Sequence, residues 1–149
     1  MNFSRTTEYA LRIMSFMAMN EQKLYSANEI YANLKIPFRY LRKLLTTLSK
    51  SGLLISVQGK NGGYRISKDL SEISLLDIIQ QTGDNKFKNE CFFGFHDCAF
   101  VKKCAMHDKW AAVRENINQV LTTTTLEEIK ETGPHSFISN NNSVFTKND

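Results

Sequence analysis

Three cysteines, Cys91, Cys98 and Cys104, lie within fourteen residues of a chain that contains no others. Because the number is odd, a fully paired set of disulfides within one chain is impossible. Thiols gathered in this way in a reducing cytosol are more often metal ligands or redox groups than crosslinks. Thiolate sulfur suits an iron–sulfur cluster, and three ligands in one loop bind it with little further loss of chain entropy. The spacing therefore predicts a metal or redox centre.

A site of this kind needs a fourth ligand. His107 follows Cys104 by three residues, which is one helical turn, so that both side chains can face the same point. His96 also lies nearby, although a surface histidine is the simpler interpretation. The three cysteines and His107 could instead bind structural zinc, but Cys91 and Cys98 lack the short spacing of a zinc knuckle. A metal-free switch, in which a reactive cysteine forms a disulfide, is a further alternative.

The basic residues are concentrated in the first part of the chain. Residues 1–90 carry 13 Lys and Arg against 8 Asp and Glu, whereas residues 91–149 carry 6 against 7. The stretch 37–68 has no acidic residue and holds Arg39, Arg42, Lys43, Lys50, Lys60, Arg65 and Lys68. A charge run alone is typical of a solvated surface, but an uninterrupted basic run also fits a polyanion-binding surface.

Helical periodicity predicts three helices in the first fifty residues. The first covers residues 4–19. The second begins at Ser26, which forms a capping-box pattern with Glu29. The third runs from about Pro37 to Lys50, because proline is favoured at the first helical position and Gly52 fits a left-handed cap. Two helices joined by a short turn, the second of them basic, indicate a helix-turn-helix whose second helix enters the major groove.

A hairpin is expected directly after the basic helix. Residues 53–58 and 63–66 have the pattern of two strands, and a glycine-rich basic loop connects them. Such a hairpin is a wing, because glycines allow the backbone to approach a phosphate or the minor groove closely. An ordinary hairpin with a solubilising lysine is the simpler alternative, but the position after a helix-turn-helix favours the wing.

The second half of the chain is expected to hold a dimerisation helix. Ser74 begins a short helix, and the helical period returns from about Ala105 to Leu121. The apolar stripe of this later helix is too long for a small winged domain to cover, so we expect it to pack across a homodimer. Thr124 and Glu127 suggest another capping box before a final short helix.

The expected fold class is therefore mainly α with a small β wing. We expect a winged helix-turn-helix DNA-binding domain over residues 1–82 and a cysteine-bearing sensor loop over 83–104. A long dimerisation helix and a short C-terminal helix follow over 105–132. Residues 133–149 lack an apolar pattern, which predicts a disordered tail.

Length and composition argue against two other classes of protein. No apolar stretch approaches the roughly 18 to 20 residues of a membrane span, and the one near the start is not followed by a cleavage site. The chain is therefore expected to stay in the cytoplasm, away from membranes. Its 149 residues contain no phosphate loop, nucleophile elbow or carboxylate pair, so an enzyme is not expected.

Four segments of the chain match a known family. They are Ser4 to Arg12, Ile36 to Leu41, Val57 to Tyr64, and a cysteine block that runs from Cys91-Phe92-Phe93-Gly94 through Cys98 to Cys104-Ala105-Met106-His107-Asp108-Lys109-Trp110. In this order, over about residues 1–132, they resemble the bacterial winged-helix regulators of the Rrf-two type. That family includes the iron–sulfur regulator IscR and the nitric-oxide-sensing repressor NsrR.

The resemblance implies a homodimer that crosses its long C-terminal helices. Each winged helix would lie on one half of a near-palindromic operator in double-stranded DNA. The expected DNA contacts lie at the start of the second helix, on the third helix and in the wing: Ser26, Arg39, Tyr40, Arg42, Lys43, Gln58, Gly59, Lys60, Asn61 and Gly62. The family's wing usually has arginine at the position of Gln58, so either Lys60 replaces that charge or the operator preference differs.

The resemblance also implies an iron–sulfur cluster, [2Fe-2S] or [4Fe-4S], that senses redox, nitric oxide or iron–sulfur status. IscR-like members complete the cluster with a histidine that corresponds to His107. NsrR-like members use an acidic residue of the partner subunit that corresponds to Glu8. The expected function is thus a transcriptional repressor whose metal ligands are Cys91, Cys98, Cys104 and either His107 or Glu8. A zinc site or a thiol switch on the same DNA-binding regulator remains the alternative.

Overall fold

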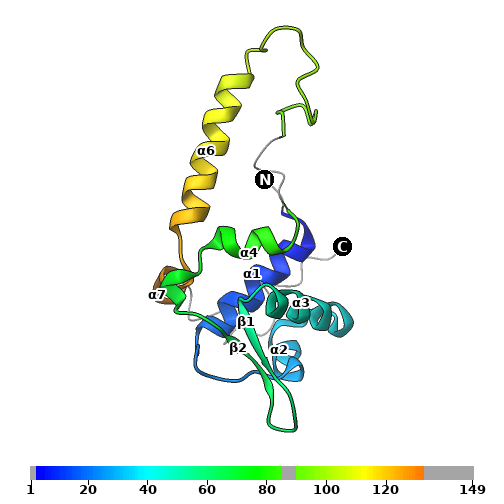
Figure 1. The fold of residues 1–149 in the computed structure, drawn as a ribbon, viewed down its shortest axis with the longest axis vertical. Helices are drawn as coiled ribbons and strands as arrows, with labels where there is room; N and C mark the ends of the chain where they lie inside the picture. Colours follow the sequence, from blue (N-terminus) through cyan, green and yellow to red (C-terminus); the bar gives the residue numbers. More distant parts are fainter. Residues whose placement is uncertain (1–2, 85–89, 133–149) are drawn as a thin grey trace.

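The computed structural model describes residues 3–84 and 90–132. Within them the chain is mainly helical, with one two-stranded antiparallel sheet (Figure 1). In chain order the elements are α1 (Arg5–Ala18), α2 (Ala27–Leu34), α3 (Phe38–Lys50), β1 (Leu54–Val57), β2 (Gly63–Ile66), the 3-10 helix η1 (Leu70–Glu72), α4 (Leu75–Gln81), α6 (His107–Thr123) and α7 (Leu126–Thr132). The expected fold class is confirmed. The predicted disordered tail, residues 133–149, lies outside the described residues.

Helix α1 forms the centre of the hydrophobic core. Its buried apolar residues recur at helical spacing and are Ala10, Ile13, Met14, Met17 and Ala18. Helices α2, α3, α4 and α7 and strand β2 all pack against α1. The apolar side chains of these elements form one cluster, so that burial of apolar surface, worth about 25 cal/mol per Å², holds the winged domain together.

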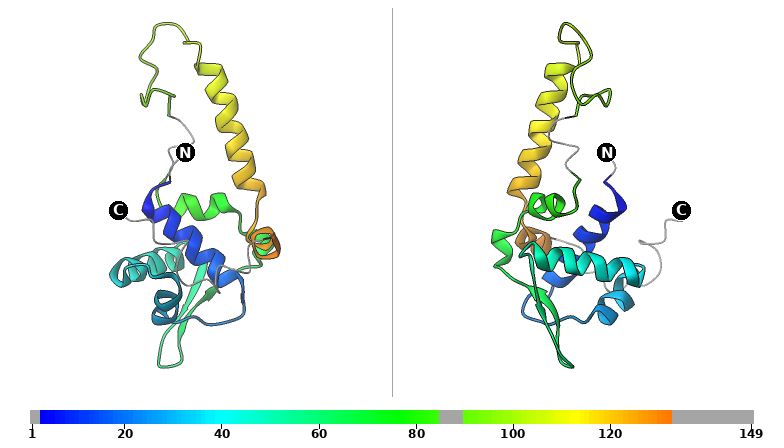
Figure 2. Two further views of the ribbon diagram at one scale, coloured as in Figure 1. Left: turned by 180° about the vertical axis from the view of Figure 1, so that it is seen from behind. Right: turned by 45° about the vertical axis from the view of Figure 1, so that its right-hand side comes forward.

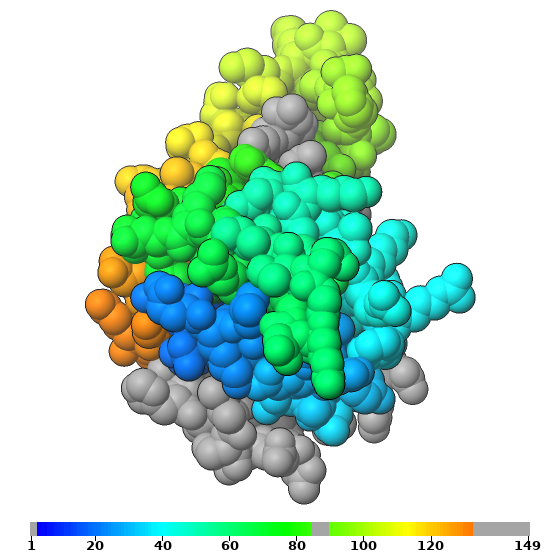
Figure 3. All heavy atoms as spheres, turned by 60° about the horizontal axis from the view of Figure 1, so that its bottom comes forward, coloured from blue at the N-terminus to red at the C-terminus, as the bar shows by residue number. Residues whose placement is uncertain are grey.

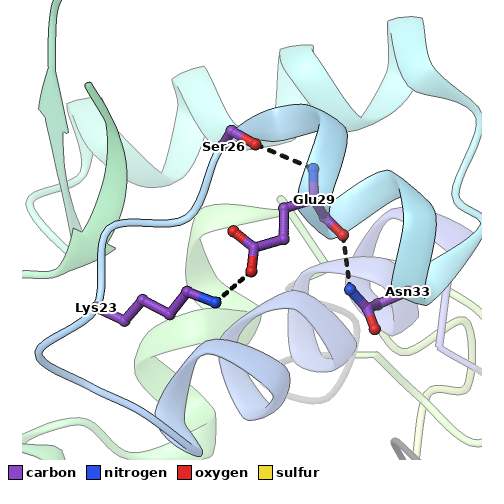
Figure 4. A network of polar contacts seen from close by, with 4 residues as sticks. All are labelled: Lys23, Ser26, Glu29 and Asn33. Carbon is purple, nitrogen blue, oxygen red and sulfur yellow. Dashed lines mark hydrogen bonds and ion pairs between the residues drawn. The ribbon is translucent and has the colours of Figure 1, made fainter. Parts of the chain in front are cut away.

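The start of α2 is fixed by polar contacts (Figure 4). The backbone N–H of Glu29 donates to the Ser26 hydroxyl at 3.1 Å, as the sequence pattern predicts. The reciprocal half of the expected capping box is replaced, because the Glu29 carboxylate accepts a hydrogen bond from Lys23 Nζ. The Asn33 amide donates to the Glu29 carbonyl at 2.8 Å. The connection from α1 is thereby tied to α2.

A left-handed residue makes the turn from α2 to α3. Lys35 has φ of 53°, and its N–H donates to the carbonyl of Tyr31 at 2.9 Å. Pro37 is the N-cap of α3 rather than its first helical residue, since the helix begins at Phe38. The buried face of α3 consists of Leu41, Leu44, Leu45 and Leu48. These two helices and their turn have the arrangement of a helix-turn-helix.

Strands β1 and β2 form the wing. They pair in antiparallel register, with Val57 opposite Gly63. Tyr25 adds a one-residue bridge at the base, because Tyr25 and Tyr64 exchange two backbone hydrogen bonds of 2.8 Å. A Cβ on Gly63 would lie 2.6 Å from the Tyr25 carbonyl oxygen, so glycine permits this close approach. The loop before α2 and the wing are therefore joined.

Helix α6 extends away from the winged domain (Figures 1 and 2). It begins at His107, slightly later than the sequence predicts, and it packs against α4. Leu121 is the only buried residue of this helix, whereas Val113 is 44% exposed and Val120 is 60% exposed. The single chain therefore leaves most of the predicted apolar stripe uncovered. Neither α6 nor any other helix of the described residues is long and apolar enough to cross a membrane.

Helix α7 returns the chain to the core, where Leu126 is fully buried. The capping box before α7 lies one residue later than predicted. Thr125 N–H donates to Glu128 Oε2 at 3.3 Å, and Glu128 N–H lies 3.4 Å from Thr125 Oγ1. The prediction of Thr124 and Glu127 was therefore wrong in register, because the same Thr and Glu types recur at the next positions.

Candidate DNA-binding surface and sensor loop

The exposed face of α3 carries three of the predicted DNA contacts. Arg39, Arg42 and Lys43 are exposed, on the sides of the helix away from its buried leucines. The hydroxyls of Thr46 and Thr47 donate to the carbonyls of Arg42 and Lys43 at 3.0 and 3.1 Å. These two hydroxyls are therefore already hydrogen-bonded to the backbone. The side chains that this face offers to phosphates or base edges are the three longer, cationic ones.

The tip of the wing carries the other predicted contacts. Its exposed residues are Gln58, Gly59, Lys60 and Asn61. Gly62 is half-buried, and a Cβ there would lie 2.0 Å from the Val57 carbonyl oxygen, so a larger residue would force the turn open. Figure 3 shows the wing beside the α2–α3 segment on one face of the molecule. Helix and wing can therefore contact one ligand together.

This face is electropositive. No acidic residue occurs between Glu29 and Asp69, and eight basic residues lie between them. Glu29 itself is paired with Lys23, and this hydrogen bond raises the pKa of Lys23 above its ordinary value. An uninterrupted cationic surface of this kind attracts a polyanion.

Two further predicted contacts already bond within the chain. The Tyr40 hydroxyl is hydrogen-bonded to the Thr6 hydroxyl, and its ring meets Tyr9 edge to face with centroids 5.6 Å apart. The Ser26 hydroxyl caps α2. Tyr40 is half-buried and links α3 to the first turn of α1, while DNA contacts by Tyr40 and Ser26 stay predictions.

Sequence reasoning missed an aromatic pair at the start of α3. The rings of Phe38 and Tyr31 meet edge to face, with centroids 5.8 Å apart and planes at 89°. Phe38 is 37% exposed and Tyr31 is 42% exposed, and neither belongs to the core cluster. The available signal was an aromatic residue directly before Arg39 in a basic helix.

The three cysteines lie in the segment that precedes α6. All three are free thiols, with Cys98 exposed and Cys91 and Cys104 half-buried. A tight turn follows Cys91, whose carbonyl accepts from Gly94 N–H at 2.8 Å. Within residues 3–84 and 90–132, no three His, Cys, Asp or Glu side chains converge closely enough to hold a metal ion. The predicted ligands therefore share one segment without being assembled around a point.

The candidate fourth ligands occupy different elements. His107 is the exposed first residue of α6, and its N–H donates to the Cys104 carbonyl at 3.0 Å. Glu8 lies on α1, 3.8 Å from Arg12 in an ion pair. His96 is almost fully exposed, with Nδ1 3.5 Å from an Asp97 carboxylate oxygen. The choice between His107 and Glu8 stays a prediction.

Aromatic contacts attach the cysteine segment to α6. Phe92 meets Trp110 at 5.6 Å and Phe93 at 5.3 Å between centroids, and Phe93 meets Phe100 at 6.2 Å. The Trp110 indole N–H donates to the Glu90 carbonyl at 3.0 Å. Because the three phenylalanines remain 50 to 55% exposed, they anchor the segment without being buried themselves.

A buried polar cluster joins the segment after α4 to the start of α1. Asp84 is only 7% exposed, and its carboxylate accepts from Ser4 N–H at 2.8 Å and from the Thr7 hydroxyl at 3.0 Å. The Thr7 and Thr82 hydroxyls lie 2.6 Å apart. A carboxylate at a helix N-terminus is favourable, but no local sequence pattern reveals a pairing across 80 positions.

Comparisons of sequence place the chain among transcriptional regulators. The profile of the Rrf2 family, described as an iron-dependent transcriptional regulator, matches residues 3–132. The HTH-type transcriptional regulator NsrR of Oceanobacillus iheyensis is 30% identical, over 87% of this chain and 89% of the relative. The HTH-type transcriptional regulator IscR of Serratia proteamaculans is also 30% identical, over 87% of this chain and 79% of the relative.

Comparison with solved structures gives the same fold. CymR, the global cysteine regulator of B. subtilis, superposes with a TM-score of 0.76 at 24% identity, covering 88% of this chain and 97% of that chain. Staphylococcus aureus CymR is 28% identical with a TM-score of 0.70, covering 86% of this chain and 97% of that chain.

Proposed function

Because this chain belongs to the Rrf2 family of transcriptional regulators, we propose that it is a homodimeric repressor that senses redox, nitric oxide or iron–sulfur status through an iron–sulfur cluster. It acts in the cytoplasm on a near-palindromic operator in double-stranded DNA. One observation carries the proposal: a basic helix and wing share one face, and three free thiols lie together in the segment before the long helix.

The DNA-binding half acts through α3 and the wing. The recognition helix of such a domain lies in the major groove, and in this proposal Arg42 reads base edges there. Lys60 at the wing tip neutralises phosphate, and the glycines around it let the backbone come close. The bonds of Tyr40 to α1 fix the orientation of α3 relative to the core, which favours a defined docking geometry.

The dimer forms along α6. Trp110, Val113, Ile117 and Val120 follow the three–four spacing of a coiled-coil seam, and all are at least partly exposed in the single chain. A second copy of α6 covers this stripe and excludes it from water. Two winged domains are then presented to the two halves of a near-palindrome.

The cysteine loop is the sensor. Its donor set fits an iron–sulfur cluster, since Cys91, Cys98 and Cys104 supply soft sulfur and are free. His107, or Glu8 of the partner subunit, is the fourth ligand. When bound, the cluster supplies a centre that reacts with nitric oxide or oxidants. The loop must rearrange to bring its thiols together. Because the loop adjoins α6, cluster ligation then changes how the two α6 helices pack in the dimer.

A metal-free thiol switch is the second candidate, with structural zinc as a third. Cys98 is exposed and free, which a reactive thiol requires. Among the structural neighbours, Staphylococcus aureus CymR was also solved in an oxidized form, at 28% identity. On this alternative, the same DNA-binding half responds to a disulfide or a sulfenic acid in place of a cluster.

Anaerobic purification distinguishes the sensor chemistries. The visible absorption and circular dichroism spectra are recorded together with iron, sulfide and zinc content, on the wild type and on Cys98→Ser. We expect charge-transfer bands with stoichiometric iron and sulfide in the wild type and their loss in Cys98→Ser. Stoichiometric zinc without colour supports the structural site. A colourless, metal-free protein after reconstitution overturns the cluster and leaves the thiol switch.

A further inference from the structure

Phe38 occupies an unusual position for a large apolar side chain. It is the first residue of α3, and its ring is 37% exposed. Leu41 and Leu45, one and two turns further along this side of the helix, are buried, whereas Phe38 is absent from both the core cluster and the partly buried side chains packed against it. Packing of the winged domain therefore leaves a substantial part of Phe38 in water. This exposed part adds nothing to the hydrophobic stabilisation of the domain.

The surroundings of Phe38 are cationic. Arg39 follows directly, Arg42 lies one turn further on the helix, and Lys35 stands in the turn before it, all of them exposed. No carboxylate occurs in the sequence from Ile30 to Lys68. An apolar edge framed by cations suits a ligand that presents phosphates around an apolar group, and it does not suit an ordinary apolar protein surface.

The ring is also held in one orientation. Tyr31 of α2 meets Phe38 edge to face at 89° with centroids 5.8 Å apart, which is a favourable geometry for two aromatic rings. A ring that is already fixed loses little freedom when a ligand packs against it. Tyr31 therefore acts as a positioning residue for Phe38.

We propose that Phe38 reads a thymine in each half of the operator by packing against its 5-methyl group. The proposal rests on the proposed function, in which α3 enters the major groove. The first residues of a recognition helix contact base edges there. The thymine methyl is the apolar group of the major-groove pattern, and phenylalanine is among the side chains that contact it.

The test begins with sites chosen by the protein itself. Duplexes are selected from a random library by the wild type, and separately by Phe38→Ala and Phe38→Leu. Wild-type sites should carry a thymine at one fixed position of each half-site. Phe38→Ala should lose that preference while keeping the rest of the consensus, and Phe38→Leu, which retains an apolar side chain, should keep it. Urea denaturation of each variant confirms that it is folded.

A single-group substitution in the DNA then isolates the methyl. Replacing that thymine by uracil in both half-sites removes only the 5-methyl groups. Wild-type affinity should fall about fourfold for each half-site, the effect of taking one methyl group out of contact. Phe38→Ala should bind the two duplexes equally. Tyr31→Phe, which keeps the ring pair, should behave as wild type.

The outcomes separate this proposal from the one on which it rests. If the wild type binds no duplex with the salt dependence of phosphate contacts, both proposals fail. If the wild type selects a consensus that Phe38→Ala shares in full, the thymine assignment alone is overturned. It is equally overturned if uracil at every half-site thymine leaves wild-type affinity unchanged.

Discussion

The carboxylate of Asp84 accepts a hydrogen bond from the backbone N–H of Ser4 at 2.8 Å, although the two residues lie 80 positions apart. This bond joins the end of the winged domain, just before the cysteine segment, to the N-terminus of α1. A second hydrogen bond, between the hydroxyls of Thr6 and Tyr40, joins α1 to α3. Asp84, at the end of the segment after α4, and the basic helix α3 are therefore both fixed to the start of α1.

Asp84→Asn should destabilise the fold. The carboxylate is buried and accepts from Ser4 and Thr7, so the substitution removes charge-assisted bonds and turns an amide toward two donors. We expect the free energy of unfolding to fall by about 1–3 kcal/mol, measured by urea denaturation. Asp97→Asn, at a nearly fully exposed side chain, is the matched control and should change nothing. Equal stabilities of the two variants would contradict the role of Asp84.

Charges placed on the α6 stripe should separate the dimer. Val113→Glu and Val120→Glu put a carboxylate into the proposed seam, where it would be desolvated without a partner. Sedimentation velocity should show monomers for both variants at concentrations where the wild type is dimeric. Gln119→Glu adds the same charge to a neighbouring exposed position off the stripe and should remain dimeric. A dimeric Val120→Glu protein would place the interface elsewhere.

Local patterns in the sequence predicted most of the winged domain. The period of Ala10, Ile13 and Met17 and the cap at Ser26 depend on residues a few positions apart, so they survive in the fold. The partner of Glu29 was mispredicted because Lys23 lies outside the helix and competes for the same carboxylate.

The remaining features depend on tertiary structure, which a single sequence does not specify. The bond of Asp84 to Ser4 forms only when α4 packs against α1. The prediction that the cysteine segment is a sensor came from residue types and family resemblance, and its thiols do not converge within the described residues of one chain. In the proposed function their assembly depends on a cofactor or a second subunit, and neither is encoded in local spacing.

Arg42→Ala and Lys60→Ala should affect DNA binding differently. Arg42 lies on the helix proposed to enter the major groove, so its loss should relax the preference at one base position. Lys60 contacts phosphate in the proposal, so its loss should weaken all sequences alike and reduce the slope of log K against log salt by about 0.9. Fluorescence anisotropy across a salt series measures both. Lys103→Ala, in the cysteine segment, is the control, and identical behaviour of the first two variants would refute the division of roles.

Tyr25 should make the fold sensitive to alkaline pH. Burial of its side chain, which is 5% exposed, raises the pKa of the phenol above its ordinary value of 10.0, while the Lys23 ammonium, 4.7 Å from the ring centroid, opposes this shift. The unfolded state then ionises at lower pH than the folded state, so stability is retained below about pH 10 and falls as the pH rises further. Urea denaturation above pH 10 should show a steeper loss in the wild type than in Tyr25→Phe. Tyr31→Phe should follow the wild type, and parallel slopes for all three proteins would exclude Tyr25 as the cause.

His107→Ala should disturb the cluster more than His96→Ala. The His107 backbone already bonds to the Cys104 carbonyl, so its side chain starts one turn from a thiolate ligand, whereas His96 is solvent-exposed beside Asp97. The visible circular dichroism spectrum and the rate of iron loss to a chelator report on ligation under anaerobic conditions.

If His107→Ala leaves both unchanged, Glu8→Gln becomes the decisive variant. Loss of the cluster in Glu8→Gln but not in His107→Ala assigns the fourth ligand to Glu8, and mixing the Glu8→Gln chain with a cysteine-free chain tests whether it acts across the dimer. In that mixed dimer, one cluster forms if the cysteines of one subunit are completed by Glu8 of the partner subunit, whereas no cluster forms if the cysteines and Glu8 must come from the same subunit. A heterodimer of wild type and the double variant Cys98→Ser, Glu8→Gln should give the opposite result, because its single complete cysteine set retains a cluster only if Glu8 comes from the same subunit.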